Sequence, residues 1–502
     1  MEVSTLEELN APSPPWGGPQ VAPLADEAGQ AEALSTADDD VFMLLGTENQ
    51  RRRHQRRIWG RLLLVYATTL FLLAVAFGGY LLRSVSSVNW RKGLSSSWKG
   101  VSPPEAKWEV PSLIQFENSL TPSLRAGKEL VGLTASLQAA NLRNVPSQMA
   151  NEVMQSLAEH ISNGQSKDLI GMKLTLTSMQ ALDSAEVDEI PRTYEVTGFL
   201  GAGGRSVALE VKEEDTGKTL AMKLFTVAVD PSYPSLLSRI SANLDGYRRI
   251  VQETTAMHQA SGKTNLSEAG EARGLALASG FATIKGVPAV MRCPSVYLLG
   301  EVELMERFCG DLLGIFTPRN GLPLEAKEYA AKRMLLEVLH LQHAGFSHND
   351  LKLLNFFVRE DGSFFLGDFE SGTPIGHPLD KQKSVTVIYA EKELAVAAMD
   401  SSRNAGMPVV NEKSDMWSLG LSLYSIFTNG KLPYGLQNSD NPAETLKAAA
   451  FERVSARTLR KPLTEAGVPQ RWQDLIVDLL QVDREDRIDA ATLVTSYADI
   501  IN

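Results

Sequence analysis

Apolar and polar positions alternate in the middle of the chain over two short runs, which predicts two β-strands. Residues 194–200 and 206–211 place apolar side chains at every second position, as expected of strands with one buried face. A third run, residues 220–225, is apolar except for Lys223. A lysine inside a buried strand is costly unless it has a charged partner. Lys223 is therefore the first candidate functional residue.

Apolar residues recur at helical spacing in two other regions. Over residues 237–257 they return every three or four positions, which predicts an amphipathic helix that carries Glu253. A second helix is expected over residues 325–343, because several leucines share one face and Gly345 follows as a stop signal. Ser147 precedes a shorter periodic segment and is expected to cap a further helix.

Residues 62–82 form an uninterrupted apolar stretch without a charged side chain. At about 1.5 Å per residue, a helix of this length crosses the roughly 30 Å hydrocarbon core of a bilayer. A buried core helix rarely runs this long without a polar face, and a secretory signal peptide is shorter. Arg residues cluster before the stretch, over residues 51–61. This predicts a single-pass signal anchor with a cytoplasmic N-terminus and a lumenal or extracellular main body, and leaves later cleavage of the anchor open.

The remaining composition sets outer limits on organisation and partners. The chain has 502 residues and a formal net charge of −11. This length exceeds one ordinary core, and the acidic balance argues against nucleic acid as a partner, because phosphate binding requires a basic surface. Residues 1–50 hold acidic side chains but no Lys or Arg and are predicted to be a disordered tail. Residues 83–193 are predicted to be a linker and an N-terminal extension that packs on the following domain.

The sequence holds two cysteines, Cys293 and Cys309, which excludes a disulfide-rich scaffold and a cysteine-rich zinc site. They flank two apolar runs with a predicted turn at Gly300 and Glu301, so that a hairpin would let them face each other. In an oxidising compartment they could then form a disulfide. Two buried free thiols are equally consistent with the sequence.

A glycine-rich turn joins the first two predicted strands. Its sequence is Gly201-Ala202-Gly203-Gly204-Arg205-Ser206. Glycines at such a turn let backbone N–H groups approach phosphate oxygens without obstruction by side chains. Turns of this kind also join many ordinary hairpins, so the motif gains meaning only from Lys223, which follows on the third strand.

A second motif combines the residue types that phosphoryl transfer requires. The helix predicted over residues 325–343 is followed by His348-Asn349-Asp350-Leu351-Lys352 and Asn355, and then, after an apolar strand, by Gly367-Asp368-Phe369-Glu370. Phosphoryl transfer needs an aligned hydroxyl, divalent metal ions and neutralised charge. Asp350 would orient the attacking hydroxyl or accept its proton, and Lys352 would neutralise the phosphoryl group. Asn355 and Asp368 would bind Mg²⁺.

Taken together and in this order, these residues resemble the protein kinase superfamily. Residues 414–420 are similar to the helix that supports the catalytic loop, and residues 432–434 to the segment that follows it. Glu393 fits the glutamate that ends the activation segment, and Arg487 fits its buried ion-pair partner. Lys352, two residues after the catalytic aspartate, is the Ser/Thr-type arrangement.

The resemblance covers residues 194–500 and implies an α+β, bilobal protein-kinase-like fold behind the transmembrane helix. Residues 194–308 would form a small lobe built on an antiparallel sheet, and residues 309–500 a larger helical lobe. The implied cofactors are ATP and Mg²⁺, and the implied partner is a protein substrate. Glu253 would pair with Lys223, with Glu268 and Glu271 as alternatives. The remaining residues expected to bind the nucleotide are Gly201, Gly203, Gly204, Ser206, Glu306 and Asp311.

Within the superfamily, the chain most resembles the rhoptry kinases of coccidian parasites, which include secreted kinases and pseudokinases. The resemblance lies in the membrane segment, the extension before the small lobe and the widened region over residues 226–290. It implies a secretory organelle such as the rhoptry, or secretion, as the location of the protein.

Two departures from the superfamily pattern leave two functions open. Asn349 replaces the arginine before the catalytic aspartate, and Glu370 replaces the glycine after Asp368-Phe369. The first function is an active Ser/Thr kinase, favoured by the retained lysine and aspartates. The second is a nucleotide-binding pseudokinase that acts as an allosteric or scaffolding partner, favoured by the two departures. A receptor with a cytoplasmic kinase domain conflicts with the Arg distribution around the anchor.

Overall fold

The computed structural model describes residues 108–141, 145–181, 186–228, 266–379, 385–399, 408–451 and 456–502. All of these belong to one compact unit, Trp90–Asn502. The predicted tail and anchor, residues 1–82, and the predicted helix over residues 237–257 lie outside the described residues. Among the helices that the structure does describe, none is both long and apolar enough to cross a membrane.

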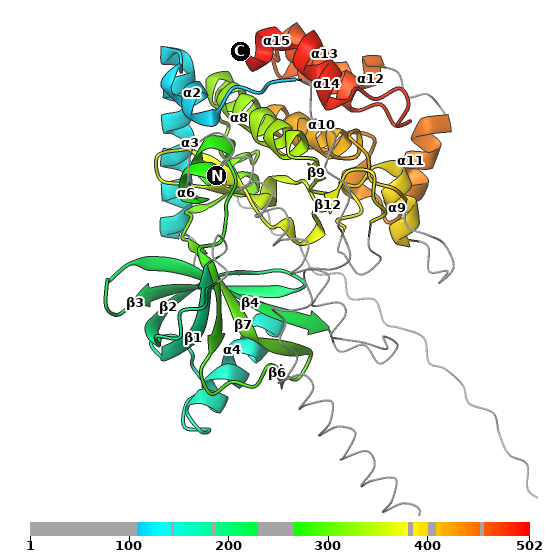
Figure 1. Cartoon of the computed structure of the whole chain (residues 1–502). Helices are drawn as coiled ribbons and strands as arrows, with labels where there is room; N and C mark the ends of the chain where they lie inside the picture. The colour runs from blue at the N-terminus through cyan, green and yellow to red at the C-terminus, as the bar shows by residue number, and fades with distance from the viewer. Residues whose placement is uncertain are drawn as a thin grey trace, which may run out of the picture. The chain divides into compact units, whose positions relative to one another are not determined.

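The small lobe is an antiparallel sheet of seven strands, drawn in green in Figure 1. The two strands predicted from alternation and the strand predicted from the third apolar run are confirmed as β2, β3 and β4, and each pairs with the next. The strands are β1 (Lys173–Ala181), β2 (Arg192–Ala202), β3 (Ser206–Glu213), β4 (Thr219–Ala228), β5 (Gly280–Ile284), β6 (Val290–Arg292) and β7 (Val296–Glu306).

The sheet closes on itself because β4, which begins the strand order, also pairs with β7. Strand β1 pairs with both β2 and β5, and β7 pairs with both β5 and β4. This closure pairs both edges of β4, and an unpaired strand edge invites pairing with other chains. Because β1 lies before residue 194, the folded unit extends further toward the N-terminus than the predicted kinase domain.

The predicted turn between the two cysteines is wrong. Residues on both sides of Gly300 form the single strand β7, which pairs with β6 through Leu299. A side chain at Gly300 would come within 2.6 Å of the Pro288 carbonyl oxygen, so glycine permits this close strand contact. Both cysteines are free and buried. Cys293 packs in the small-lobe core and Cys309 in the large-lobe core, so the alternative of two thiols is correct.

Helix α4 (Gln148–Ile161) covers the small-lobe sheet and completes its core. Its N-cap is Ser147, as predicted, whose side chain accepts a hydrogen bond from the Ala150 backbone N–H. The buried face of α4 includes Val153 and Leu157, which lie in one cluster with apolar residues of the strands.

The large lobe is mainly helical and packs around two buried helices, α8 (Leu324–His343) and α10 (Ser414–Phe427). Helix α8 agrees with its prediction, and Gly345, with φ of 81°, follows its end. Every residue of α10 is buried, including Asp415. The other helices are α6 (Leu266–Arg273), α7 (Leu312–Ile315), α9 (Lys392–Met399), α11 (Pro442–Phe451), α12 (Ala456–Glu465), α13 (Gln470–Leu479), α14 (Ala490–Ser496) and α15 (Ala498–Ile501).

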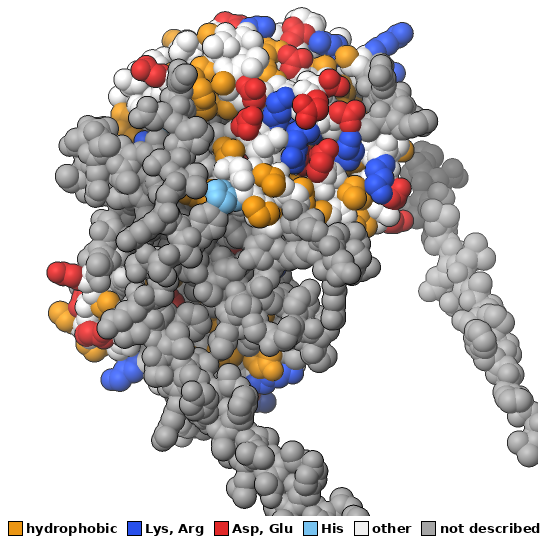
Figure 2. All heavy atoms as spheres, turned by 45° about the vertical axis from the view of Figure 1, so that its right-hand side comes forward, with side chains coloured by type: hydrophobic (Ala, Val, Ile, Leu, Met, Phe, Trp, Pro, Cys, Tyr) orange, Lys and Arg blue, Asp and Glu red, His pale blue; other side chains and the backbone are white. Residues whose placement is uncertain are grey.

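Figure 2 shows that acidic and basic side chains lie interspersed on the described part of the large lobe in that view.

Short strands and 3₁₀ turns lie in the loops between these helices. The short strands are β8 (Gly310–Asp311), β9 (Phe346–Ser347), β10 (Phe356–Val358), β11 (Phe364–Leu366) and β12 (Thr373–Pro374), and the turns are η2 (Leu353–Asn355), η3 (Phe369–Ser371) and η4 (Leu436–Asn438).

Two helices of the N-terminal extension, α2 (Leu113–Asn118) and α3 (Pro122–Asn141), pack on the large lobe. Glu117 of α2 accepts hydrogen bonds from the Tyr329 hydroxyl at 2.8 Å and from Arg333 at 2.5 Å. Arg333 is 2% exposed and also contacts Glu337. A buried arginine without carboxylates would be strongly destabilising, so the extension is an integral part of this fold.

His340 of α8 should make the stability of the protein sensitive to acid. Its Nε2 lies 3.0 Å from the Pro111 carbonyl oxygen, just before α2. Burial, with a contribution from the Arg273 charge, lowers the pKa of His340 from 6.5 to about 3. As the pH falls below about 6.5, the unfolded chain binds a proton that the folded protein excludes, so the free energy of unfolding decreases by up to about 1.4 kcal/mol per pH unit.

Replacement of His340 by Gln removes this titration and retains a donor for the Pro111 carbonyl. We expect urea unfolding between pH 7 and pH 5 to show a shallower loss of stability in His340→Gln than in the unchanged protein. Equal slopes for the two proteins would show that His340 does not titrate in this way.

Candidate functional site

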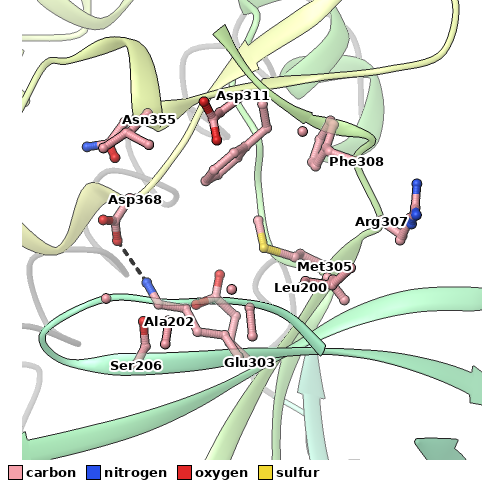
Figure 3. A pocket seen from close by; sticks show the side chains of 18 of the residues that line it. Leu200, Ala202, Ser206, Glu303, Met305, Arg307, Phe308, Asp311, Asn355 and Asp368 are labelled. Carbon is pink, nitrogen blue, oxygen red and sulfur yellow. Dashed lines mark hydrogen bonds and ion pairs between the residues drawn. The ribbon is translucent and has the colours of Figure 1, made fainter. Parts of the chain in front are cut away.

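A cavity of about 860 Å³ lies between the sheet of the small lobe and the loops of the large lobe. Figure 3 shows Ala202 and Ser206 on the small-lobe side and Asn355 and Asp368 opposite them. Most of the predicted site residues line this cavity, although they are far apart in the sequence. They are Gly201, Gly203, Ser206, Lys223, Glu306, Asp311, Lys352, Asn355 and Asp368.

The glycine-rich turn forms one wall of the cavity, between β2 and β3. A Cβ atom added at Gly201, Gly203 or Gly204 would meet nothing within 4 Å, and none of the three has positive φ. Neither packing nor backbone angles within the protein therefore require glycine at these positions. A ligand that approaches the backbone closely would require it, which fits the predicted contact with phosphate.

A Gly203→Ala variant should separate folding from binding. Because the site is open and its φ is compatible with alanine, we expect unchanged stability or a gain of about 0.4–1 kcal/mol. The added methyl group would hinder approach of the nucleotide, and we expect a several-fold higher KM for ATP. Thermal unfolding and steady-state kinetics measure the two effects, and loss of stability without a change in KM would contradict the role given to this turn.

Lys223 projects from β4 into the cavity and contacts two carboxylates. Its Nζ lies 2.8 Å from Asp368 Oδ1 and 2.8 Å from Glu370 Oε1. Burial acts to lower the pKa of Lys223, but the carboxylates of Asp368, Glu370 and Glu303 outweigh it and hold this pKa well above its ordinary value. Lys223 is thus a fixed positive charge in the cavity, suited to binding phosphate.

The predicted partner of Lys223, Glu253, lies outside the described residues. Of the two alternatives, Glu271 forms an ion pair with Arg359 instead, at 2.5 Å. Glu268 is exposed on α6. Neither alternative is therefore found as the partner of Lys223. Of the two carboxylates that do contact it, Asp368 was predicted as a metal ligand and Glu370 only as a departure from the superfamily pattern.

The catalytic motif places Asp350 in a network of hydrogen bonds. Its Oδ2 is 2.6 Å from the Lys352 ammonium, and its Oδ1 accepts a hydrogen bond of 3.0 Å from the backbone N–H of Thr386. Lys352 also donates to the Thr386 hydroxyl at 2.8 Å. The three residues form one unit at the cavity, in which the carboxylate is held in a fixed orientation next to a positive charge.

Helix α10 positions this loop through Asp415. The carboxylate of Asp415 accepts hydrogen bonds from the backbone N–H groups of His348, at 2.6 Å, and Asn349, at 2.9 Å. Asn349 has φ of 61°, a conformation that asparagine tolerates better than most residues. Its side-chain amide donates to the Ser371 carbonyl oxygen at 3.0 Å. The residue that replaces the usual arginine therefore ties the catalytic loop to the segment after Asp368.

Asn355 and Asp368 supply oxygen atoms that suit Mg²⁺. Asn355 donates its Nδ2 to the Asp350 carbonyl oxygen at 2.8 Å, which leaves its amide oxygen as the atom that could bind a metal. Lys223 holds the pKa of Asp368 below its ordinary value against the effect of burial, so this carboxyl group is ionised. The described residues contain no group of three or more His, Cys, Asp or Glu side chains that could hold a metal. Two protein oxygens fit Mg²⁺, which usually completes its shell with water and phosphate oxygens.

The strand β7 leads into the segment predicted to bind the base and the ribose. The side chain of Glu306 is held by Arg359 at 2.6 Å, which leaves backbone groups as the means by which this residue could contact a ligand. Asp311 caps α7 by accepting a hydrogen bond from the Gly314 N–H at 2.9 Å. Burial raises the pKa of Asp311, although the hydrogen bond from Gly314 and a second one from the Leu313 backbone oppose the shift. Gln138 of the extension donates to the Gly314 carbonyl oxygen and lines the same cavity.

The partner of Arg487 is Glu391, and the prediction of Glu393 is wrong. Arg487 Nη1 lies 2.5 Å from Glu391 Oε2, and both side chains are fully buried. Arg484 forms a second ion pair with Glu391. Glu391 precedes α9 and points into the large lobe, whereas Glu393 lies in the first turn of the helix and is partly exposed. Burial acts to raise the pKa of Glu391, but the two arginines lower it overall.

Sequence reasoning missed three contributors to the site. Thr386 was not singled out, because a lone threonine carries no local signal. Gln138 belongs to an extension without a recognisable motif. Glu370 was noted for what it replaces, and its contact with Lys223 depends on the way the two lobes face each other.

Comparisons with known proteins agree with this geometry. Residues 289–497 match the family described as protein kinase domain. The serine/threonine-protein kinase ROP17 of Toxoplasma gondii is 32% identical over 155 residues, which cover 29% of this chain and 23% of that protein. The dual specificity protein kinase TTK of Mus musculus is 27% identical over 313 residues, 58% of this chain and 32% of the relative. The chain thus matches less than two thirds of the length of either relative.

Solved structures show the same fold. ROP2 from Toxoplasma gondii, described as a virulence factor with a protein-kinase fold and no enzymatic activity, has a TM-score of 0.54 at 17% identity and covers 76% of this chain and 96% of its own. The kinase domain of ROP18, also from Toxoplasma gondii and solved with AMP-PNP and sucrose, has a TM-score of 0.50 at 17% identity and covers 75% and 95%. At this identity the likeness extends to the fold alone.

Proposed function

The chain belongs to the protein kinase family, and from that premise we propose that it transfers the γ-phosphate of ATP to serine or threonine hydroxyls of a protein. The observation that carries the proposal is the unit of Asp350, Lys352 and Thr386 beside the cavity. A fixed carboxylate next to a positive charge is what an attacking hydroxyl and a moving phosphoryl group require.

Each residue has a role that follows from its position. Asp350 orients the acceptor hydroxyl and takes its proton, while Lys352 balances charge on the transferred group. Lys223 binds phosphate oxygens of the nucleotide, and the glycine-rich turn approaches them through its backbone. Asn355 and Asp368 would hold Mg²⁺, which neutralises phosphate charge when bound. The lining of the cavity supports this arrangement, since these residues all face the same space except Asp350, which reaches it through Lys352.

A second function, that of a nucleotide-binding pseudokinase, is favoured by one observation. Lys223 contacts both Asp368 and Glu370, so an additional negative charge lies beside the carboxylate expected to bind metal. In an active enzyme, Asp368 would have to give up at least part of its contact with Lys223 in order to bind the metal. A pseudokinase would use the same cavity to bind nucleotide and present its surface to a partner.

Phosphoryl transfer and nucleotide binding, measured together, separate the two functions. Full-length protein would be incubated with Mg²⁺ and labelled ATP, with itself and a generic basic protein as acceptors, followed by phosphoamino acid analysis. Phosphoserine or phosphothreonine is the expected product. Absence of transfer, together with higher thermal stability in ATP, would replace the proposed kinase by the pseudokinase.

Location forms a further part of the proposal. The apolar residues 62–82 and the Arg residues before them support a single-pass anchor, with the kinase domain on the lumenal or extracellular side. The resemblance to rhoptry kinases supports a secretory organelle. Protease treatment of sealed vesicles tests this, because a lumenal kinase domain would resist digestion until the vesicles are opened.

A further inference from the structure

The second carboxylate on Lys223 is held in place by the backbone around it. Glu370 lies in the 3₁₀ turn η3 directly after Asp368, whose φ of 63° starts that turn. Phe369 is fully buried, and Asn349 donates to the Ser371 carbonyl oxygen. Anchored on both sides, the backbone of Glu370 fixes where its side chain can reach, and that side chain meets Lys223 at 2.8 Å.

The environment makes this contact energetically important. The side chain of Lys223 is 15% exposed and that of Glu370 is 16% exposed. In such a poorly hydrated site an ammonium group needs a carboxylate partner. Asp368 is one partner, but it is also the carboxylate best placed to bind Mg²⁺. If Asp368 held Mg²⁺, Glu370 would remain to neutralise and orient the lysine.

We propose that Glu370 is a positioning residue that holds Lys223 toward the phosphate groups of the nucleotide. The inference rests on the proposed function, because that function is the reason to expect that Lys223 binds the phosphate groups of ATP. Glu370 departs from the family pattern, and this departure by itself favours a pseudokinase. In this proposal the same residue supplies a contact that keeps the Lys223 ammonium group in place.

The two interpretations predict opposite results for Glu370→Gly, which restores the usual residue of the family. If Glu370 only competes for Lys223 and repels metal and phosphate, glycine should improve ATP binding. If Glu370 positions Lys223, glycine should weaken it. Glycine also loosens the backbone, so Glu370→Gln is needed beside it to remove the charge while keeping the shape of the side chain.

Binding of ATP and of adenosine, each to the full-length protein, provides the decisive comparison. Lys223 would contact phosphates and not the base, so we expect both variants to raise the Kd for ATP about tenfold, the worth of one charge-assisted hydrogen bond, and to leave the Kd for adenosine unchanged. Equal losses for the two ligands would indicate general damage to the cavity and overturn the proposal. Unchanged or tighter ATP binding would also overturn it.

A control and a nucleotide-free measurement complete the test. Glu444→Gln removes an exposed carboxylate of α11 that pairs with Lys447, outside the cavity, and should change neither affinity. A double-mutant cycle of Lys223→Met and Glu370→Gln, followed by urea unfolding without nucleotide, measures the contact itself, and additive effects would contradict it. Selective loss of ATP affinity in a protein that transfers no phosphate would support the positioning role and reject the kinase. Phosphate transfer that is unaffected in the Glu370 variants would support the kinase and reject the positioning role.

Discussion

An Asp350→Asn variant is expected to transfer phosphate about 100- to 10,000-fold more slowly than the unchanged protein, the usual contribution of a positioned general base. The substitution keeps the size of the side chain, which is buried and held by Lys352 and Thr386. It removes the charge that orients the hydroxyl and the site that takes its proton. The measurement is the initial rate of phosphoryl transfer at saturating ATP.

Nucleotide binding should be nearly unchanged in this variant, because Asp350 acts on the acceptor hydroxyl rather than on ATP. Asp440→Asn, which removes an exposed carboxylate, serves as the matched control. A rate in Asp350→Asn equal to that of the control would show that Asp350 is not the catalytic base, and would point to a contaminating kinase if transfer persisted in both.

The residues of the catalytic motif could be predicted because they lie close together in the sequence. Asp350, Lys352 and Asn355 fall on one loop, and Asp368 follows after the two short strands β10 and β11. Local order then implies proximity in space. The strands around the glycine-rich turn and helix α8 could be predicted equally well, because alternation and helical spacing depend only on neighbouring residues.

Contacts between distant segments could not be predicted in this way. The closure of the sheet depends on the pairing of β4 with β7, about which the residues of β4 carry no information. The choice between Glu391 and Glu393 depends on which side chain points inward before α9, and two residues are enough to change that direction. The contact of Glu370 with Lys223 joins the two lobes, so its meaning appears only when both are in place.

Glu391→Ala should destabilise the large lobe by about 3–5 kcal/mol, the usual cost of removing one partner of a buried ion pair. Arg487 would stay buried without its carboxylate, and Arg484 would lose the same partner. Since the ion pair fastens the segment before α9 to the region after α13, its loss should also loosen the end of the activation segment. Urea unfolding at neutral pH measures the change in the free energy of unfolding.

Glu393→Ala provides a matched comparison, because it removes the same side chain two residues away. Glu393 lies in the first turn of α9, is partly exposed and has Lys392 as a neighbour at 3.8 Å. Partly exposed pairs of this kind contribute about 0–1 kcal/mol, so we expect a much smaller loss than for Glu391→Ala. A larger loss in Glu393→Ala would restore the partner first predicted for Arg487. If both variants lost little, the buried arginine would have to be neutralised by a rearrangement that the folded structure does not show.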